Sequence, residues 1–523
     1  MPGLILVLFF FFSVLPGIPV VPVLAKTGPY DTDTLSLTLE DAVLIALENN
    51  FGLRDVKLDR ERARQQVRDA WGNVYPQVTA SANYTRNLVT ANPFAGSGAE
   101  DLFADFGAIG WLRYNENLRL EGKDGITYDE YLERQFQGLQ DAGITPPSVD
   151  DPFSVDNQFV ASLSITQTLF SGSAFGAIQG AEQFQKLSED AVHRERQVLI
   201  DQVRRAFFGA LLTAQQVDVL QRSVERLERT VDDARQAARQ GLTSRFEELS
   251  AEVELVNLET ELIQAENRAE LTARNINLLL DLDVHQPVKL TGDLSMAALQ
   301  PVGDVALEEA IDWAFAFRPD LAQAKGLVEI SRINERITKS AYRPMVNAFA
   351  NINYIGRVPD DRELIMTDPA DPFAFSSSSR SFFHDSFWNA NVAVGLNFSW
   401  NIFSGFQDRA RAEQRRIETR KNEIQYEFVT NAIRLEVDQA LRNLRNTERR
   451  IASQRRNIQQ AQLNYDFART RLREGVGNSL EERQASMLLD QSQLSYLLAV
   501  HDYLVAVSNF ELVIGTSLDQ LNP

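Results

Sequence analysis

The amino-acid sequence predicts a mixed α and β fold, which combines long α-helical coiled coils with a transmembrane β-barrel that several chains complete together. Three features support this prediction: an internal repeat of the whole chain, four segments with strand-like alternation, and proline-free segments with an apolar heptad pattern. The repeat is the strongest of the three, because it constrains the fold before any local pattern does.

The chain consists of one unit that occurs twice. Residues Leu37–Asn50 align without insertion with Val305–Arg318, and the same register later aligns Tyr75–Asn83 with Arg343–Asn351. A second pair of motifs, TQTLFSGSAFG and NIFSGFQDRA, repeats with a similar offset. The sequence therefore predicts two structural repeats, over residues 26–300 and 301–523.

The N-terminus resembles a secretory signal peptide. Residues Leu4–Phe12 are apolar, and Val23 and Ala25 occupy the −3 and −1 positions of a cleavage site. The basic residue that usually precedes the apolar segment is absent, so a retained membrane anchor is the alternative. We expect residues 1–25 to be a signal peptide. The chain has no cysteine, so the exported form would carry no disulfide framework.

Four segments alternate between apolar and polar residues with a period of two, which is typical of β-strands with two different faces. They lie near residues 78–88, 159–170, 346–355 and 388–402. Their length is close to the ~9–11 residues of a tilted transmembrane strand. The polar faces carry Asn, Ser and Thr and almost no charge, which suits a water-filled lumen. The alternative is the edge of a soluble antiparallel sheet, which alternates in the same way.

Four strands are too few to close a membrane barrel, which needs about eight or more. An open sheet edge in lipid is prohibitive, because its backbone groups would have no hydrogen-bond partner. If these strands span a membrane, the chain must therefore oligomerise, and three copies would supply twelve strands.

Between and after these strands, the apolar period changes to that of helices. Two segments without proline, Ala174–Arg239 and Gln407–Arg473, have a heptad pattern typical of a left-handed coiled coil. Each would be about 100 Å long at 1.5 Å per residue. Two shorter helices in each repeat would stack to roughly 95 Å; they are predicted at Phe51–Val74 with Ser244–Leu282 and at Asp320–Tyr342 with Ser479–Ile514. Helical hairpins over residues 174–283 and 405–515 would thus form a cylinder of uniform height.

Each long helix is predicted to end at a glycine. Gly241 and Gly475 stand where a glycine lets the backbone adopt the left-handed conformation after a helix. A serine then stands at a capping position with a glutamate three residues later, the spacing of a capping box; the pairs are Ser244 with Glu247 and Ser479 with Glu482.

At each change from strand to helix the sequence is Phe-Ser-Gly. The serines, Ser171 and Ser404, can cap the new helix, and the glycines, Gly172 and Gly405, allow the backbone to turn. We interpret both motifs as architectural.

Two loops interrupt the strand pairs. Leu88–Gln158 covers about 70 residues, well beyond the usual loop length, and it is rich in acidic residues. It is expected to be either a solvated surface loop or a lid or recognition element outside the cell. Gly356–Phe387 is its shorter counterpart, and the serines of Ser376–Ser381 suggest flexibility.

The formal net charge of −20 argues against a nucleic-acid partner, because phosphate binding requires a basic surface. The four histidines are scattered, and no spacing typical of a metal-binding or phosphate-binding motif occurs. We therefore expect no enzymatic activity, no cofactor and no nucleic-acid partner.

The order of these elements resembles that of the outer-membrane efflux protein family, the TolC family. The resemblance rests on the doubled order of strands and helices, the LxLEDAxxxALENN opening, the prolines before two strands, and the LFSG and IFSG motifs. It also rests on the glycine-to-alanine spacing at both helical tips, Gly241–Ala251 and Gly475–Ala485. It covers essentially the whole mature chain.

This resemblance implies a homotrimer whose twelve-stranded outer-membrane barrel continues into a long periplasmic α-helical barrel. The implied function is a passive exit duct of a tripartite efflux or type I secretion system. The implied partners are outer-membrane lipid, a periplasmic adaptor (membrane fusion) protein and an inner-membrane transporter. The chain would then lie in the cell outer membrane, with a large periplasmic portion.

The resemblance also implies which residues form functional sites. Acidic rings close the periplasmic aperture in this family, and the matching positions are Glu481 and Gln484, of which the second lacks the acid. Glu482 could replace that acid or cap the helix, and Glu247 matches Glu481 in the first repeat. The tips that contact the adaptor correspond to Gly241, Leu242, Thr243, Ser244, Gly475, Val476, Gly477, Asn478 and Ser479.

An alternative class is an exported structural coiled-coil protein or adhesin without a channel, anchored by its apolar N-terminus. That alternative explains the heptads. It does not explain four alternating strands placed symmetrically in two repeats.

Overall fold

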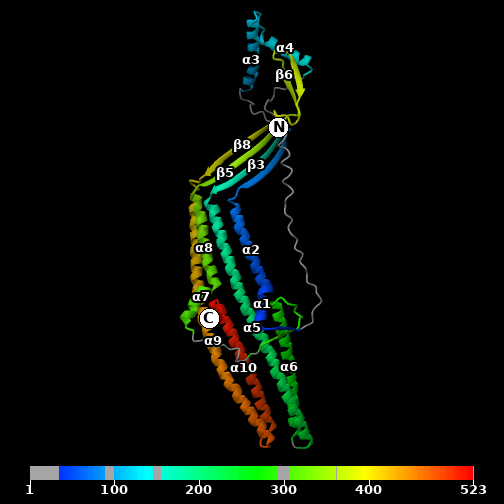
Figure 1. Cartoon of the computed structure of the whole chain (residues 1–523), viewed down its shortest axis with the longest axis vertical. Helices are drawn as coiled ribbons and strands as arrows, with labels where there is room; N and C mark the ends of the chain where they lie inside the picture. The colour runs from blue at the N-terminus through cyan, green and yellow to red at the C-terminus, as the bar shows by residue number, and fades with distance from the viewer. Residues whose placement is uncertain are drawn as a thin grey trace. The chain divides into compact units, whose positions relative to one another are not determined.

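The computed structural model of the chain describes residues 34–88, 99–144, 155–241, 243–292, 294, 305–360 and 362–521. The expected signal peptide (residues 1–25), the expected boundary between the repeats at residue 300, and Leu242 lie outside the described residues. Within them the chain combines long helices with short strands (Figure 1).

The chain forms two compact units, each assembled from separate segments. Unit 1 contains Met1–Leu53, Arg196–Ala310 and Val437–Pro523, and unit 2 contains Arg54–Glu195 and Ile311–Glu436. The two longest helices of the described chain contribute residues to both units; they are α5 (Gly172–Arg239) and α9 (Gln407–Arg473). Each unit therefore draws on both repeats of the sequence.

The described part of unit 1 is mainly helical. Strands β1 (Leu35–Leu37) and β4 (Val288–Leu290) form its small parallel sheet. Its helices besides α5 and α9 are α1 (Leu39–Asn49), α6 (Arg245–Leu279), α10 (Ser479–Ile514) and α11 (Leu518–Leu521), and α7 (Leu307–Phe317) begins in it. Helices α9 and α10 have the bounds that the heptad pattern and the intervening glycine predict.

The core of unit 1 follows the heptads. Val437, Leu444 and Ile451, each seven residues after the last, are buried along one side of α9, as are Leu199 and Val203 on α5. This spacing brings one side of each long helix repeatedly to the same neighbour, as in coiled coils.

Helix α10 is the one described helix that is long and apolar enough to cross a membrane by length and composition alone. Its buried residues include Leu489, Val500 and Phe510. Packing within unit 1 therefore accounts for part of its apolar character.

Unit 2 contains an antiparallel sheet of four strands in the order β2, β3, β5, β8 (Figure 1). Each strand lies where the alternation predicts one, although the last ends at residue 399 rather than near 402. Their bounds are β2 (Gln77–Arg86), β3 (Asn157–Phe170), β5 (Met345–Val358) and β8 (Trp388–Ser399).

The register of this sheet separates two chemically different faces. One row across all four strands consists of Ser81, Ser162, Asn353 and Asn391, and Ser164 Oγ donates to Asn351 Oδ1 on the same face at 2.7 Å. The opposite face is apolar and exposed, with Val394 at 77% of its full exposure. Within the described residues β2 and β8 each pair with one neighbour only, so both edges of the sheet are open.

The helices of unit 2 include α2 (Phe51–Gly72) and α8 (Pro319–Lys339), and α8 is followed by a 3₁₀ turn (Ser340–Tyr342). The two insertions in the sheet have secondary structure of their own. The first contains α3 (Ala99–Leu120) and α4 (Tyr128–Asp141), and the second contains β6 (Glu363–Thr367) and β7 (Phe375–Ser379).

This structure corrects two expectations. The segment Leu88–Gln158 is not simply a solvated loop, because two helices form within it. The segment Ser376–Ser381 is not a flexible stretch, because most of it lies in β7, where Ser378 pairs with Leu364 of β6. The pairing gives its backbone groups the hydrogen-bond partners that a solvated loop would find in water.

Candidate functional site

The first helical tip of unit 1 turns at Gly241. Its φ of +74° lies in the left-handed region, which a residue with a Cβ adopts only at a cost. Ser244 then caps α6, because its side chain accepts a hydrogen bond from the backbone N–H of Glu247 at 3.3 Å. The carboxylate of Glu247 also accepts a hydrogen bond from the hydroxyl of Thr243, so the segment after the turn is held to the first turn of α6.

The second tip turns at Gly475, with a φ of +71°. Here the prediction of the cap is wrong by one residue: Asn478 caps α10, and its side chain accepts from the backbone N–H of Glu481 at 2.8 Å. Asparagine caps helices as well as serine does, so the helix begins at Ser479 instead of after it. A Cβ on Gly477 would lie 3.0 Å from Arg471 Cβ, so this turn is tightly folded.

The predicted aperture residues differ in their surroundings. Glu481 stands three residues after the cap Asn478 and 3.7 Å from a guanidinium nitrogen of Arg471, so it has local partners within its own tip. Gln484 is exposed. Glu481 therefore occupies the same place in its helix as Glu247 does in the first tip.

Glu482 does not cap the helix. It is half-buried, and burial raises its pKa above the ordinary value of 4.5; Asp233 also raises it, while Arg469 and Arg483 oppose the shift. Burial disfavours the charged form of an acid. The surroundings of Glu482 therefore disfavour its charged form.

Two ion pairs lie beside this residue, in a cavity of about 540 Å³ that α5, α6 and α10 line. Arg226 of α5 binds Asp490 of α10. Arg483 of α10, whose side chain is 7% exposed, lies with its Nε 3.3 Å from a carboxylate oxygen of Glu254 on α6. These pairs connect the first helical hairpin to the second.

The two Phe-Ser-Gly motifs at the strand-to-helix turns have different hydrogen bonds and backbone conformations. Ser171 Oγ accepts a hydrogen bond from Ala174 N at 3.2 Å and caps α5. Ser404 Oγ accepts from Asp408 N at 3.3 Å, but Ser404 stands three residues before the start of α9 and is not its N-cap. Gly405 has a left-handed φ of +61°. Gly172 does not; a Cβ there would lie 2.5 Å from Ser340 Cβ, so this glycine is required for close packing instead.

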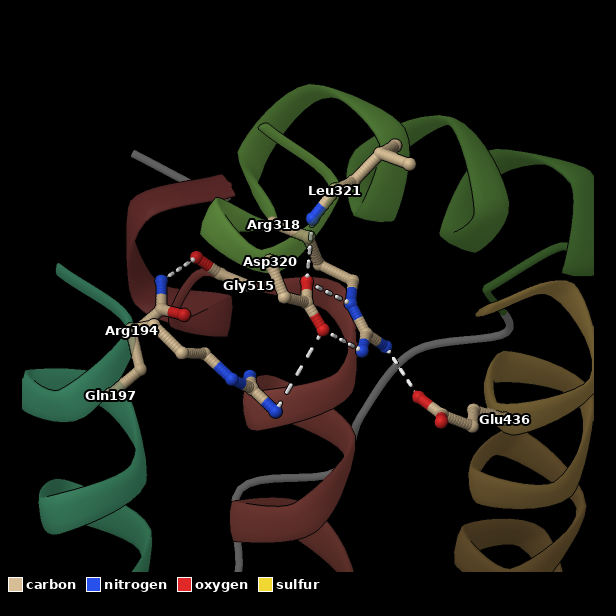
Figure 2. Close-up of polar contacts among 7 residues, drawn as sticks. All are labelled: Arg194, Gln197, Arg318, Asp320, Leu321, Glu436 and Gly515. Atoms are coloured by element: carbon tan, nitrogen blue, oxygen red, sulfur yellow. Dashed lines mark hydrogen bonds and ion pairs between the residues drawn. The ribbon is translucent and has the colours of Figure 1, made fainter. Parts of the chain in front are cut away.

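A buried charge cluster lies at the start of α8 in unit 2 (Figure 2). The side chain of Arg318 is 3% exposed; it donates to both carboxylate oxygens of Asp320 and, at 2.7 Å, to Glu436 of α9. Arg194 of α5 lies 3.9 Å from Asp320. Burial alone would raise the pKa of Asp320, but the hydrogen bonds and charge of Arg318 lower it below the ordinary 3.8.

The cluster brings together side chains from three helices that are far apart in the sequence. The heptad pattern does not predict this cluster, because Arg318 lies outside the long heptad segments, between α7 and α8. The capping signals do not predict it either. The spacing Arg-Pro-Asp, with proline and an acid in the first turn of a helix, was the one local signal available.

Large apolar side chains remain exposed on the helices as well as on the sheet. On α6, Val253, Val256 and Ile263 lie on one side of the helix at helical spacing and are all more than half exposed. On α9, Leu463 and Phe467 also lie on one side of the helix and are more than half exposed. Exposed apolar side chains that share one side of a helix are typical of binding interfaces.

The sequence profile of the outer membrane efflux proteins matches residues 142–280 and 310–516 of this chain. No curated protein sequence gives a significant match. Among solved structures, the CusC channel is 15% identical, with a TM-score of 0.67 over 95% of this chain and 96% of that one.

A membrane protein from Pseudomonas aeruginosa is 16% identical, with a TM-score of 0.66 over 94% of this chain and 92% of its own. The Campylobacter jejuni CmeC outer membrane channel is 14% identical, with a TM-score of 0.67 over 91% of this chain and 85% of that one. At these identities the likeness establishes the fold, and the mixed α and β fold class that the sequence predicts is confirmed.

Proposed function

The chain belongs to the outer membrane efflux protein family, and we propose that it is the outer-membrane channel of a tripartite efflux or type I secretion system. In this proposal the channel is a passive exit duct for substrates that an inner-membrane transporter delivers through a periplasmic adaptor (membrane fusion) protein. The chain carries out no catalysis in this role.

The observation that carries the proposal is the four-stranded sheet with two open edges. Its uncharged polar face suits a water-filled lumen, and its exposed apolar face suits lipid. Neither edge can remain unpaired in a bilayer, because nothing there replaces the missing hydrogen bonds. Three copies, with β8 of each pairing with β2 of the next, close twelve strands into a barrel and leave no edge.

The exposed apolar sides of α6 and α9 support the same assembly. In a trimer they would pack between neighbouring copies, and the six helical hairpins would enclose a duct in the periplasm. We propose that the signal peptide directs export and that the two tips contact the adaptor, through Gly241–Ser244 and Gly475–Ser479. Glu481, with Glu482 next to it, would lie at the periplasmic aperture.

The test compares two arginine substitutions on one strand. Val392→Arg places a charge on the apolar face of β8, and Asn391→Arg places the same charge on the polar face. A lipid-facing arginine costs about 2–4 kcal/mol near the bilayer midplane, whereas a lumen-facing one is tolerated. We expect Val392→Arg to reduce the yield of heat-modifiable trimer from membranes. Asn391→Arg should assemble normally and shift the channel toward anions in planar bilayers.

The opposite pattern would show that the faces are assigned the wrong way round. A mature chain that is soluble and monomeric without detergent would contradict the proposal and favour an anchored coiled-coil adhesin. Chemical cross-linking of the unmodified protein in detergent separates these outcomes, since a trimer gives products of up to three chains.

A further inference from the structure

The two insertions of the sheet fold together into one structure, here called the cap and defined as residues 108–144 and 362–380. Tyr131 of α4, 4% exposed, packs with its ring centroid 5.8 Å from that of Tyr114 on α3 and 5.4 Å from that of Phe373. A Cβ on Gly138 would lie 1.9 Å from the carbonyl oxygen of Phe373. Helix α4 therefore packs closely against the turn between β6 and β7.

Hydrogen bonds hold the cap in one conformation. Asn115 of α3 both donates to the carbonyl and accepts from the N–H of Ile126, each at 2.9 Å. Trp111 Nε1 donates to the same carbonyl at 2.9 Å, and Thr127 caps α4. The connection between the two helices is thus fixed by α3, and the cap presents a defined surface.

One side of α3 exposes three large apolar side chains. Ile109, Leu112 and Leu120 are 57%, 57% and 72% exposed. Residues at these helical steps lie on the side opposite Trp111 and Tyr114, which face the inside of the cap. Two charged residues lie on the same side, the exposed Arg113 and Glu116. The carboxylate of Glu116 accepts two hydrogen bonds from Arg119. Its charge is therefore matched within α3.

The connections of the cap decide what can cover this side. Helix α3 follows β2, one open edge of the sheet, and β7 precedes β8, the other open edge. When β8 of one copy pairs with β2 of the next, the β6–β7 part of one cap is brought beside the α3–α4 part of its neighbour. That part of the cap also exposes a large apolar side chain, Met366, at 44% of its full exposure.

We propose that the apolar side of α3 packs against the cap of the neighbouring copy, so that three caps form a continuous ring at the outlet of the barrel. The inference rests on the trimer proposed above and adds an interface outside the membrane. A ring of caps would narrow the outlet with folded structure, and it would stabilise the trimer through contacts that are independent of the strands.

The experiment places the photo-cross-linking residue p-benzoylphenylalanine at Leu112 in the full-length chain in outer membranes. We expect illumination to yield a two-chain product in which position 112 is joined to a cap peptide of this same chain. The control is the same residue at Glu133, an exposed position on the far side of α4 from the cap interior, which should give less of this product. The double variant Ile109→Asn, Leu112→Asn tests the surface without the probe and should raise single-channel conductance.

Unboiled migration of the same samples reports the trimer separately. If the trimer is present and position 112 joins only lipid, only another protein, or nothing, the inference is overturned while the proposed function stands. Equal two-chain products at positions 112 and 133 would also overturn it. If the trimer itself is absent, the proposed function fails and this inference fails with it.

Discussion

Arg318 binds both carboxylate oxygens of Asp320, its neighbour two residues along the chain, with nitrogen-to-oxygen distances of 2.9 and 2.5 Å. Its remaining terminal nitrogen reaches Glu436 at 2.7 Å. The first turn of α8 is therefore fixed to α9 by a guanidinium that water barely reaches. A charge buried in this way is tolerated because its partners surround it.

Replacing Arg318 with methionine should destabilise the protein strongly. The change leaves Asp320 and Glu436 close together without their cation, and loss of one partner of a buried pair costs about 3–5 kcal/mol. The control is Arg332→Met, also on α8, whose pairs with Glu329 and Glu423 are exposed and worth at most about 1 kcal/mol. Thermal unfolding of the detergent-solubilised protein should show a large loss for Arg318→Met only.

The pKa of Asp320 gives this cluster a pH dependence. Because the pKa is lowered in the folded protein, the charged carboxylate contributes stability above the ordinary value of 3.8, and this stability is lost as pH falls through the folded pKa. Asp320→Asn should therefore lower the melting temperature at pH 7 and flatten its decline below pH 4. An unchanged melting temperature at pH 7 would contradict the assignment.

Glu482 should behave in the opposite way. Its raised pKa means that the folded state holds the proton more tightly than the unfolded chain does, so stability falls as pH rises from about 4.5 through the folded pKa. Glu482→Gln removes the cost of the buried charge and should raise the melting temperature at pH 7. Glu474→Gln, at an exposed position in the same tip, is the control and should have little effect.

The glycines of the two tips should be intolerant of alanine. At a left-handed φ, a Cβ costs on the order of 1 kcal/mol, so Gly241→Ala and Gly475→Ala should distort the turns and weaken binding of a purified periplasmic adaptor. Gly209→Ala in the middle of α5 is the control. Its Cβ would meet open space at an ordinary helical φ, and it should stabilise the helix by about 0.5–1 kcal/mol. Equal adaptor binding by all three variants would count against a role for the tips.

Glu481 should make the pore selective for cations. In the proposed trimer, three copies of Glu481 around the axis would lie close together, and such a ring attracts and concentrates cations. Glu481→Ala should reduce block of single-channel current by a trivalent cation added from the periplasmic side, and Glu247→Ala should matter less. If Glu481→Ala trimers are blocked as strongly as the unmodified protein, Glu481 does not line the pore, and its role is limited to its contacts with Asn478 and Arg471 in the tip.

The sequence predicts the long elements closely and the short-range details less well. Helix α9 begins and ends at Gln407 and Arg473 as expected, since a heptad pattern without proline leaves few other conformations. The N-cap residue of α10 is Asn478 and not the predicted Ser479, because neighbouring Asn and Ser residues cap helices almost equally well.

The cap and the cluster around Arg318 were beyond prediction for a different reason. Tyr131 and Phe373 are far apart in the sequence, and each is an ordinary aromatic residue until the other packs against it. Gly172 shows the same limit, since its need for a small side chain comes from Ser340, which is supplied by the other repeat. The periodicity of a sequence predicts single helices and strands. These contacts form between different elements, so periodicity does not predict them.

The open edges of the sheet also have a genetic consequence. If three chains close one ring, as proposed, a single chain with a defective edge interrupts the whole assembly. If normal and altered chains are made in equal amounts and mix at random, only about one trimer in eight contains normal chains alone. Alleles that damage β2 or β8 while leaving the other edge intact should therefore be dominant. Alleles that abolish the chain altogether should be recessive.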